Sequence, residues 1–173
     1  MKYFSYLIIG TFLSLNGLTA APIFAATTLV ESQAEYKQAA KSLKPGDTIV
    51  LASGEWKDFE ILFTGEGLEG KPITLTAQEK GKVIITGQSN LKIAGKYLLV
   101  SGLVFKDGYT PTREVIAFRR NKQHLANHSR VTEVVIDRFN NPERTESDYW
   151  VSMYGKNNRF DHNHLEGKNN NGV

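Results

Sequence analysis

Leu99-Val-Ser-Gly-Leu-Val-Phe-Lys-Asp-Gly108 sets a pattern that recurs twice further along the chain. The later copies are Val135-Ile-Asp-Arg-Phe-Asn-Asn141 and Arg159-Phe-Asp-His-Asn-His-Leu-Glu-Gly167. Each joins an apolar strand, a polar kink, a second apolar residue and an Asn or Gly exit. Aligned on these features, Ile136 and Phe160 are equivalent and lie 24 residues apart. A spacing of about 20 to 45 residues is typical of a solenoid repeat.

Short apolar segments between Gly, Asn, Asp and Lys turns fill the rest of the sequence and leave no room for crossover helices. The predicted strands are 48–51, 73–76, 83–86, 91–93, 97–100, 103–105, 115–118, 131–136, 150–153 and 159–160. Such strands also suit a sandwich or a barrel, but the Asn-Gly and Asp-Gly signals of antiparallel hairpins are nearly absent. We therefore predict an all-β fold, a right-handed single-stranded parallel β-helix. Asn side chains at its bends are expected to bond to neighbouring Asn along a stack.

One helix is predicted near the start of this β-region. Ser32 and Glu35 have the spacing of a capping box, and an Ala and Leu pattern follows over residues 33–43 until Pro45-Gly46. An open solenoid end exposes core side chains and unpaired backbone groups. We expect this helix to cap the N-terminal end of the solenoid.

The first 26 residues read as a secretory signal peptide, with Lys2, an apolar run over 6–15 and a small-residue stretch ending at Ala26. The run is too short for a membrane span. We expect export to the periplasm or beyond the cell, and a single domain over residues 27–173 that stops before the solenoid is complete.

Composition excludes several chemistries. The chain has no cysteine, which rules out disulfides, thiolate metal sites and a cysteine nucleophile. Its net charge of +3 suits a polyanionic partner but would equally suit none.

Several stretches resemble polysaccharide lyase family 6, the alginate lyase and chondroitinase B family. They are Lys44-Pro-Gly-Asp-Thr-Ile-Val-Leu-Ala-Ser-Gly-Glu-Trp56, Gly70-Lys-Pro-Ile-Thr-Leu75, Gly95–Gly108 and Asn158-Arg-Phe-Asp-His-Asn163. The sections 118–136 and 148–155 are more similar to the alginate-active members than to the chondroitinase.

The resemblance implies β-elimination at a uronic acid in a polymer such as alginate. A calcium ion would neutralise the substrate carboxylate, a lysine would remove the C5 proton and an arginine would assist the leaving oxygen. The same resemblance implies that the calcium ligands and the catalytic residues lie beyond Val173, so no catalytic or metal residue is assigned within the chain.

Four residues are candidates for substrate binding. Lys168 and Asn169 would line the floor of a groove, although a solvated turn with an Asn ladder explains them as well. Tyr149 and Trp150 would offer an aromatic platform for a sugar. Because side chains alternate along a strand, we expect one of these two aromatic residues to be buried.

Two further patterns favour structural interpretations. Asp161-His-Asn-His164 places two His side chains on one side of a predicted strand, but no third ligand follows at a fixed spacing. The basic run Arg119-Arg-Asn-Lys122 either steers an anionic polymer or is solvated surface.

Two other functions are compatible with the same predicted fold. One is a lyase for chondroitin or dermatan sulfate or for a galacturonan, and another is a carbohydrate-binding or adhesive module without catalysis. The expected partner is an anionic polysaccharide, with neither nucleic acid nor membrane, and the oligomeric state is open.

Overall fold

The computed structural model describes residues 25–143, 145 and 148–170. The predicted signal peptide therefore lies almost wholly outside the described residues. Within the described part the elements are α1 (Gln33–Ala39), β1 (Thr27–Val30), β2 (Thr48–Leu51), β3 (Gly54–Lys57), β4 (Glu60–Glu66), β5 (Ile73–Ala77), β6 (Val83–Gln88), β7 (Asn90–Lys96), β8 (Leu98–Ser101), β9 (Leu103–Tyr109), β10 (Glu114–Ala117), β11 (Ala126–Asn127), β12 (Arg130–Thr132), β13 (Val135–Asp137), β14 (Tyr149–Ser152), β15 (Arg159–Asp161) and β16 (His164–Glu166). No helix in this part is long and apolar enough to cross a membrane.

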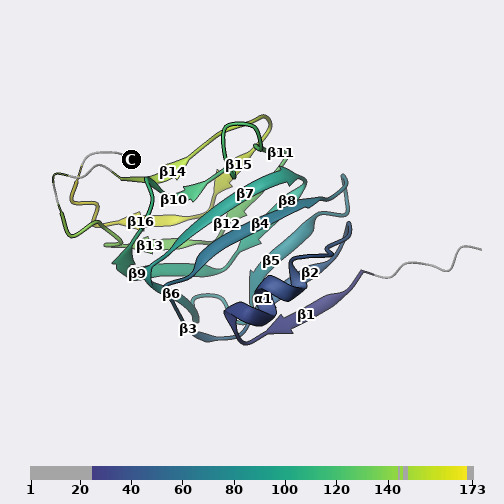
Figure 1. The fold of residues 1–173 in the computed structure, drawn as a ribbon, viewed down its shortest axis with the longest axis horizontal. Coiled ribbons are helices and arrows are strands. Elements are labelled where there is room, and N and C mark those ends of the chain that lie inside the picture. Colours follow the sequence, from purple (N-terminus) through teal and green to yellow (C-terminus); the bar gives the residue numbers. More distant parts are fainter. Residues whose placement is uncertain (1–24, 144, 146–147, 171–173) are drawn as a thin grey trace, which may run out of the picture.

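The strands form three sheets, and successive strands of the chain fall in different sheets. Sheet A has the order β1-β2-β5-β8-β12-β15, and sheet B has the order β3-β6-β9-β13-β16. Sheet C contains β4, β7, β10 and β14, with β11 paired to β7. Every pairing between these strands is parallel, which confirms the predicted parallel β-helix. Figure 1 shows the coils following one another from the blue end to the yellow end.

Coil length varies along the solenoid. The stacked positions Thr48, Thr74, Leu99, Arg130 and Arg159 are 26, 25, 31 and 29 residues apart. In the two longer coils the extra residues lie in the loops beside sheet C, since the corners between sheets A and B remain short.

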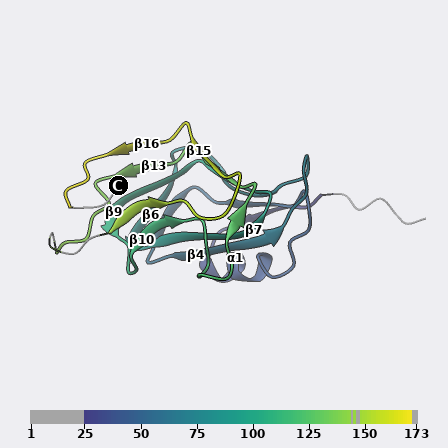
Figure 2. The same ribbon diagram turned by 90° about the horizontal axis from the view of Figure 1, so that it is seen from above.

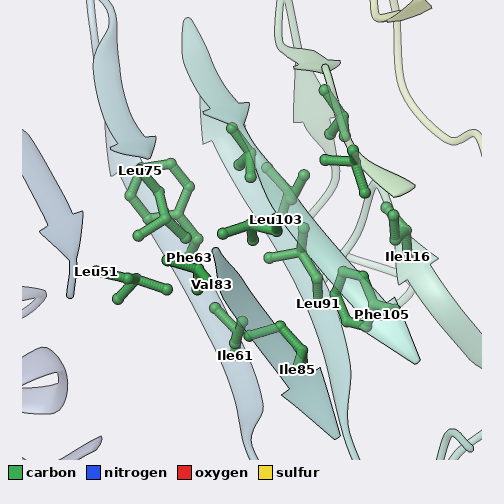
Figure 3. Packing of buried hydrophobic residues seen from close by; sticks show 14 of the residues in the cluster. Leu51, Ile61, Phe63, Leu75, Val83, Ile85, Leu91, Leu103, Phe105 and Ile116 are labelled. Carbon is green, nitrogen blue, oxygen red and sulfur yellow. The ribbon is translucent and has the colours of Figure 1, made fainter. Parts of the chain in front are cut away.

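Buried apolar side chains stack in columns inside the coils, as Figure 3 shows for part of the cluster. One column from sheet A is Ile49, Leu75, Val100 and Val131, and one from sheet B is Trp56, Ile85, Phe105 and Ile136. Each fully buried side chain of this size stabilises the fold by about 1.5–3 kcal/mol relative to exposure. The core is therefore continuous from coil to coil.

The helix caps the end of the solenoid, as predicted: it lies next to β1 and β2 in Figure 1 and along the lower edge of the view in Figure 2. Ser32 Oγ accepts a hydrogen bond from Glu35 N at 3.2 Å, and Glu35 Oε2 accepts one from Glu31 N at 2.8 Å. Tyr36 is buried edge-on against Phe59, with ring centroids 5.2 Å apart, and donates its hydroxyl to Leu62 O at 3.0 Å. Burial raises the pKa of the Tyr36 hydroxyl.

The helix is shorter than the predicted range of 33–43. It ends at Ala39, and Lys41 N already bonds to Gln38 O, three residues back. The chain then has to return to sheet A at β2. Asp47 holds that return, because its carboxylate accepts hydrogen bonds from Lys44 N and Ala26 N.

The predicted repeat alignment was wrong by one strand in the middle copy. Ile136 stacks on Leu165, whereas Phe160 stacks on Val131. The copy beginning at Val135 starts on sheet B, after the corner, while the copies beginning at Leu99 and Arg159 start on sheet A. The predicted strand 131–136 is likewise two strands, because Glu133 makes the corner between them with a φ of 56°.

The expected ladder between Asn side chains is also wrong at the corners before β15 and β16. Asn158 Oδ1 accepts from Ser129 N at 2.9 Å, and Asn163 Oδ1 accepts from Val134 N at 2.8 Å. These Asn side chains bond to the backbone of the preceding coil, where a corner leaves peptide groups without a strand partner.

Candidate substrate-binding face

Two of the longest connections of the described chain border sheet C. They lead from β10 to β11 and from β13 to β14, and the shorter connection from β9 to β10 lies beside them. Loops on a rigid scaffold carry a disproportionate share of binding residues. The hollows of this face therefore identify the candidate site.

Two hollows meet at Arg113. The larger, of about 680 Å³, is lined by Gln88, Tyr109, Thr110, Pro111, Thr112, Arg113, Asn141, Thr145 and Asp148. The smaller, of about 240 Å³, is lined by Arg113, Glu114, Arg119, Tyr149, Ser152 and Tyr154, and we call it the arginine–tyrosine hollow. A third hollow of about 520 Å³ lies further along the same sheet, beside Lys96, Arg120 and His124.

Arg113 and Tyr149 come from adjacent coils and contact each other. Tyr149 is in register with Glu114, the first residue of β10, so Arg113 directly precedes the paired position. Arg113 Nη2 donates a hydrogen bond to the Tyr149 hydroxyl at 3.0 Å, and its guanidinium carbon lies 4.9 Å from the Tyr149 ring centroid. Arg113 is exposed and Tyr149 half-buried.

Glu114, Arg119 and Tyr154 form the opposite wall of the arginine–tyrosine hollow. Arg119 Nη2 donates to Glu114 Oε1 at 2.6 Å, and the Tyr154 hydroxyl donates to the same oxygen at 3.4 Å. The Arg119 guanidinium carbon lies 3.8 Å from the Tyr154 ring centroid. Arg119 is thus fixed by a partly buried ion pair, while Arg120 and Lys122 of the same basic run are exposed.

Lys168 and Trp150, both predicted as substrate residues, lie together. Lys168 Nζ donates to Asp148 Oδ1 at 2.5 Å and to the Asn170 side chain, and it lies 5.4 Å from the Trp150 ring centroid. The Trp150 side chain is buried, with Nε1 donating to Phe139 O at 2.7 Å. The expectation that one of Tyr149 and Trp150 is buried is confirmed.

The other candidates are placed apart from one another. Asn169 N donates to Asn140 Oδ1 at 3.2 Å, on the turn beside Lys168. Tyr149 contacts Arg113 on the arginine–tyrosine hollow instead. The structure therefore brings Lys168, Asn169 and Trp150 to one neighbourhood and Tyr149 to another, and a substrate role for any of the four stays a prediction.

The two His side chains of Asp161-His-Asn-His164 do not share one strand, contrary to the prediction. His162 forms the corner between β15 and β16 with a φ of 57°, while His164 lies on β16. His162 Nδ1 lies 3.1 Å from Asp161 Oδ2, and His164 Nε2 lies 3.2 Å from Glu166 Oε2. Each ring thus has its own carboxylate partner.

Calcium was expected from the resemblance. Among the described residues no group of three or more His, Asp or Glu side chains lies close enough to hold one metal ion.

Sequence reasoning missed Arg113 and Tyr154. Arg113 follows Thr110-Pro-Thr112, a polar stretch without a recognised motif, and its partner Tyr149 is 36 positions away. Only the coil register brings the two residues together, so the available signal was the repeat spacing itself.

Comparison with known proteins places the chain in a family. The sequence model of the Chondroitinase B family matches residues 30–173. No curated protein matches significantly.

Among solved structures, the PL6 family alginate lyase AlyGC is 66% identical over 86% of this chain, with a TM-score of 0.84. A mannuronic acid specific family 6 lyase from human gut microbiota is 35% identical over 84% of the chain, with a TM-score of 0.78. A PL6 family polysaccharide lyase from Pseudopedobacter saltans is 36% identical over 83% of the chain, with a TM-score of 0.77.

The matched region spans only part of these relatives: 20% of the AlyGC chain, 35% of the gut lyase and 32% of the Pseudopedobacter protein. The match to the family model covers nearly all of the described solenoid, from β1 onward. The chain therefore belongs to the chondroitinase B family, polysaccharide lyase family 6.

Proposed function

We propose that this chain forms the first coils of an exported lyase that cleaves alginate by β-elimination. The observation that carries the proposal is the 66% identity to the alginate lyase AlyGC across a solenoid whose strands stack in the same parallel manner. The match covers 86% of this chain. The basic and aromatic lining of the hollows beside sheet C suits a polymer with one carboxylate per sugar.

The reaction removes the C5 proton of a uronate and breaks the bond from C4 to the glycosidic oxygen. A double bond forms between C4 and C5, and the leaving oxygen takes a proton. We propose that a lysine acts as base, that an arginine assists the leaving group, and that calcium neutralises the uronate carboxylate. All of these groups would come from residues beyond Val173, and the described coils would hold and align the polymer.

Two alternatives have support of their own. The family model carries the name of a chondroitinase, which favours dermatan or chondroitin sulfate as substrate. A non-catalytic carbohydrate-binding module would use the same hollows without chemistry. The identities of 66% and 35% to alginate and mannuronate lyases favour the first proposal.

The full-length protein should be incubated with alginate, with polymannuronate and with dermatan sulfate in the presence of calcium. The ultraviolet absorbance of the unsaturated product should rise with alginate, and a chelator should abolish the rise. A rise with dermatan sulfate alone would replace alginate by the sulfated polymer. Binding without any absorbance change would support the adhesive module.

A further inference from the structure

We propose that the arginine–tyrosine hollow is a binding subsite for one uronate unit, in which Arg113 and Tyr149 hold the sugar carboxylate. This inference rests on the proposed function for the identity of the polymer. It adds a site that lies on β10 and β14, within the described coils.

Arg113 has donors to spare. A guanidinium carries five N–H groups, and the hydrogen bond to Tyr149 uses one of them. Among the residues that the structure describes, no carboxylate lies within ion-pair distance of Arg113. Arg113 is exposed, and its planar fork matches a carboxylate with two parallel hydrogen bonds.

Tyr149 completes the donor set. Its hydroxyl oxygen accepts the bond from Arg113, so its own proton is free to be donated toward the hollow. The Ser152 hydroxyl, from the other end of β14, lines the same hollow. The Tyr149 hydroxyl therefore both orients the guanidinium and offers a second bond to the bound carboxylate.

Glu114 does not repel an anion here, because its charge is already offset. Arg119 pairs with Glu114 at 2.6 Å, and the Tyr154 hydroxyl donates to the same oxygen. These contacts also hold Tyr154 and Arg119 rigidly, so the wall of the hollow is formed before any ligand arrives.

The size of the hollow suits one sugar. Its volume of about 240 Å³ is smaller than the range of about 300–1,000 Å³ that is usual for sites of drug-sized ligands. The hollow therefore has room for a single sugar unit and not for several. Arg113 also lines the larger neighbouring hollow, whose lining includes Thr110, Thr112 and Thr145. A polymer running along sheet C would thus place one carboxylate at Arg113 and neighbouring hydroxyls along the threonines.

Binding of alginate oligosaccharides to the full-length protein tests the proposal, measured by calorimetry with a chelator present to prevent cleavage. Arg113→Ala should weaken binding about tenfold, the usual effect of losing one charge-assisted hydrogen-bonded pair. Arg113→Lys keeps the charge without the fork and should weaken binding by about threefold. Tyr149→Phe should also weaken binding about threefold.

Arg159→Ala is the matched control, because it removes the same charge from an exposed side chain on sheet A. It should leave affinity unchanged. Oligosaccharides whose carboxylates have been reduced to alcohols should bind the wild-type protein and Arg113→Ala equally, because the lost contact is to the carboxylate.

The outcomes separate the two proposals. If the protein cleaves alginate but Arg113→Ala binds like the wild-type protein, the subsite is wrong and the function stands. If oligosaccharides bind in an Arg113-dependent way without cleavage, the subsite stands and the lyase fails. If neither alginate nor dermatan sulfate binds in an Arg113-dependent way and alginate is not cleaved, both fail. Arg113-dependent binding of dermatan sulfate oligosaccharides alone would keep the uronate subsite and replace alginate as the polymer, because dermatan sulfate also carries a uronate in each repeat.

Discussion

Sheets A and C are made by the same coils but differ in what lies beside them. On sheet A, polar side chains of neighbouring coils form hydrogen bonds with each other. The Thr76 and Ser101 hydroxyls lie 2.8 Å apart, and Arg130 donates two hydrogen bonds to Asp161. On sheet C, the strands are also paired directly, but their side chains and those of the adjoining loops line hollows. The stacking of coils thus fixes the position of each side chain along a sheet. The length of the adjoining loops decides whether that side chain contacts the next coil or lines a hollow.

The largest expected effect compares a glycine of sheet C with one at a corner of sheet A. Gly95 has a φ of +123°, and a Cβ there would lie 1.9 Å from Gly65 O on the paired strand. Gly95→Ala should therefore destabilise the protein by about 4 kcal/mol, since backbone strain adds to a clash with backbone that cannot move. Urea unfolding followed by circular dichroism measures the loss.

Gly102→Ala is the matched control. Gly102 also has a positive φ, of +79°, but its nearest contact for an added Cβ is the Ala77 methyl at 3.1 Å. Glu133 and His162 occupy the equivalent corner in the next coils without glycine. The loss should be about 1–2 kcal/mol, and equal losses at both positions would contradict the difference between the sheets.

The second effect compares ion pairs. The side chain of Asp148, beside sheet C, is 2% exposed and pairs with Lys168, which is 14% exposed. Lys168→Met would leave a buried carboxylate without its cation and should destabilise by about 3–5 kcal/mol. Adding Asp148→Asn should recover part of that loss, because the amide needs no cation. Thermal unfolding of the single and double variants tests this coupling.

Lys80→Met serves as the surface comparison. Lys80 is 69% exposed and pairs with Glu133 at the corner between sheets A and B. Its loss should lower stability by less than about 1 kcal/mol. If Lys168→Met were equally mild yet weakened alginate binding, Lys168 would be a substrate residue, as first predicted, and not mainly a structural partner.

The solenoid and its capping helix could be predicted because their signals are local. The capping box at Ser32 and the apolar segments need only a few neighbouring residues to be recognised. The register between coils could not be predicted, because a corner such as Glu133 has a left-handed backbone conformation without the glycine that would mark it in the sequence. Strands β3 and β4 were missed because their apolar segments are short: Trp56 of β3 stands alone between two charged residues, and β4 has only the apolar run 61–63.

The candidate site was predicted only in part, for the same physical reason. Tyr149 was identified from its residue type, but Arg113 acquires its significance from a residue on the next coil. Lys168 was identified from its turn, yet its partner Asp148 belongs to the loop before β14. Contacts between coils depend on the coil length, which varies from 25 to 31 residues and which the short motifs do not reveal.

The smallest expected effect tests, through its pH dependence, the contact between Arg130 and Asp161 of neighbouring coils on sheet A. The hydrogen bonds from Arg130 to Asp161 lower the pKa of that carboxyl from 3.8 to about 2, with help from His162 and from the charge of Arg159, although partial burial opposes the shift. A lowered pKa in the folded state means that the ionised carboxylate stabilises the fold above about pH 3.8. That contribution is lost as the pH falls from 3.8 toward 2.

Asp161→Asn should therefore be less stable than the wild-type protein near neutral pH, and the difference should vanish as the pH approaches 2. Arg130→Gln removes the main cause of the shift, so its stability should fall less between pH 3.8 and 2 than that of the wild-type protein. Chemical unfolding midpoints measured across this range give both comparisons. A stability difference for Asp161→Asn that did not change with pH would mean that the amide loses packing or geometry and that the charge contact between the coils contributes nothing.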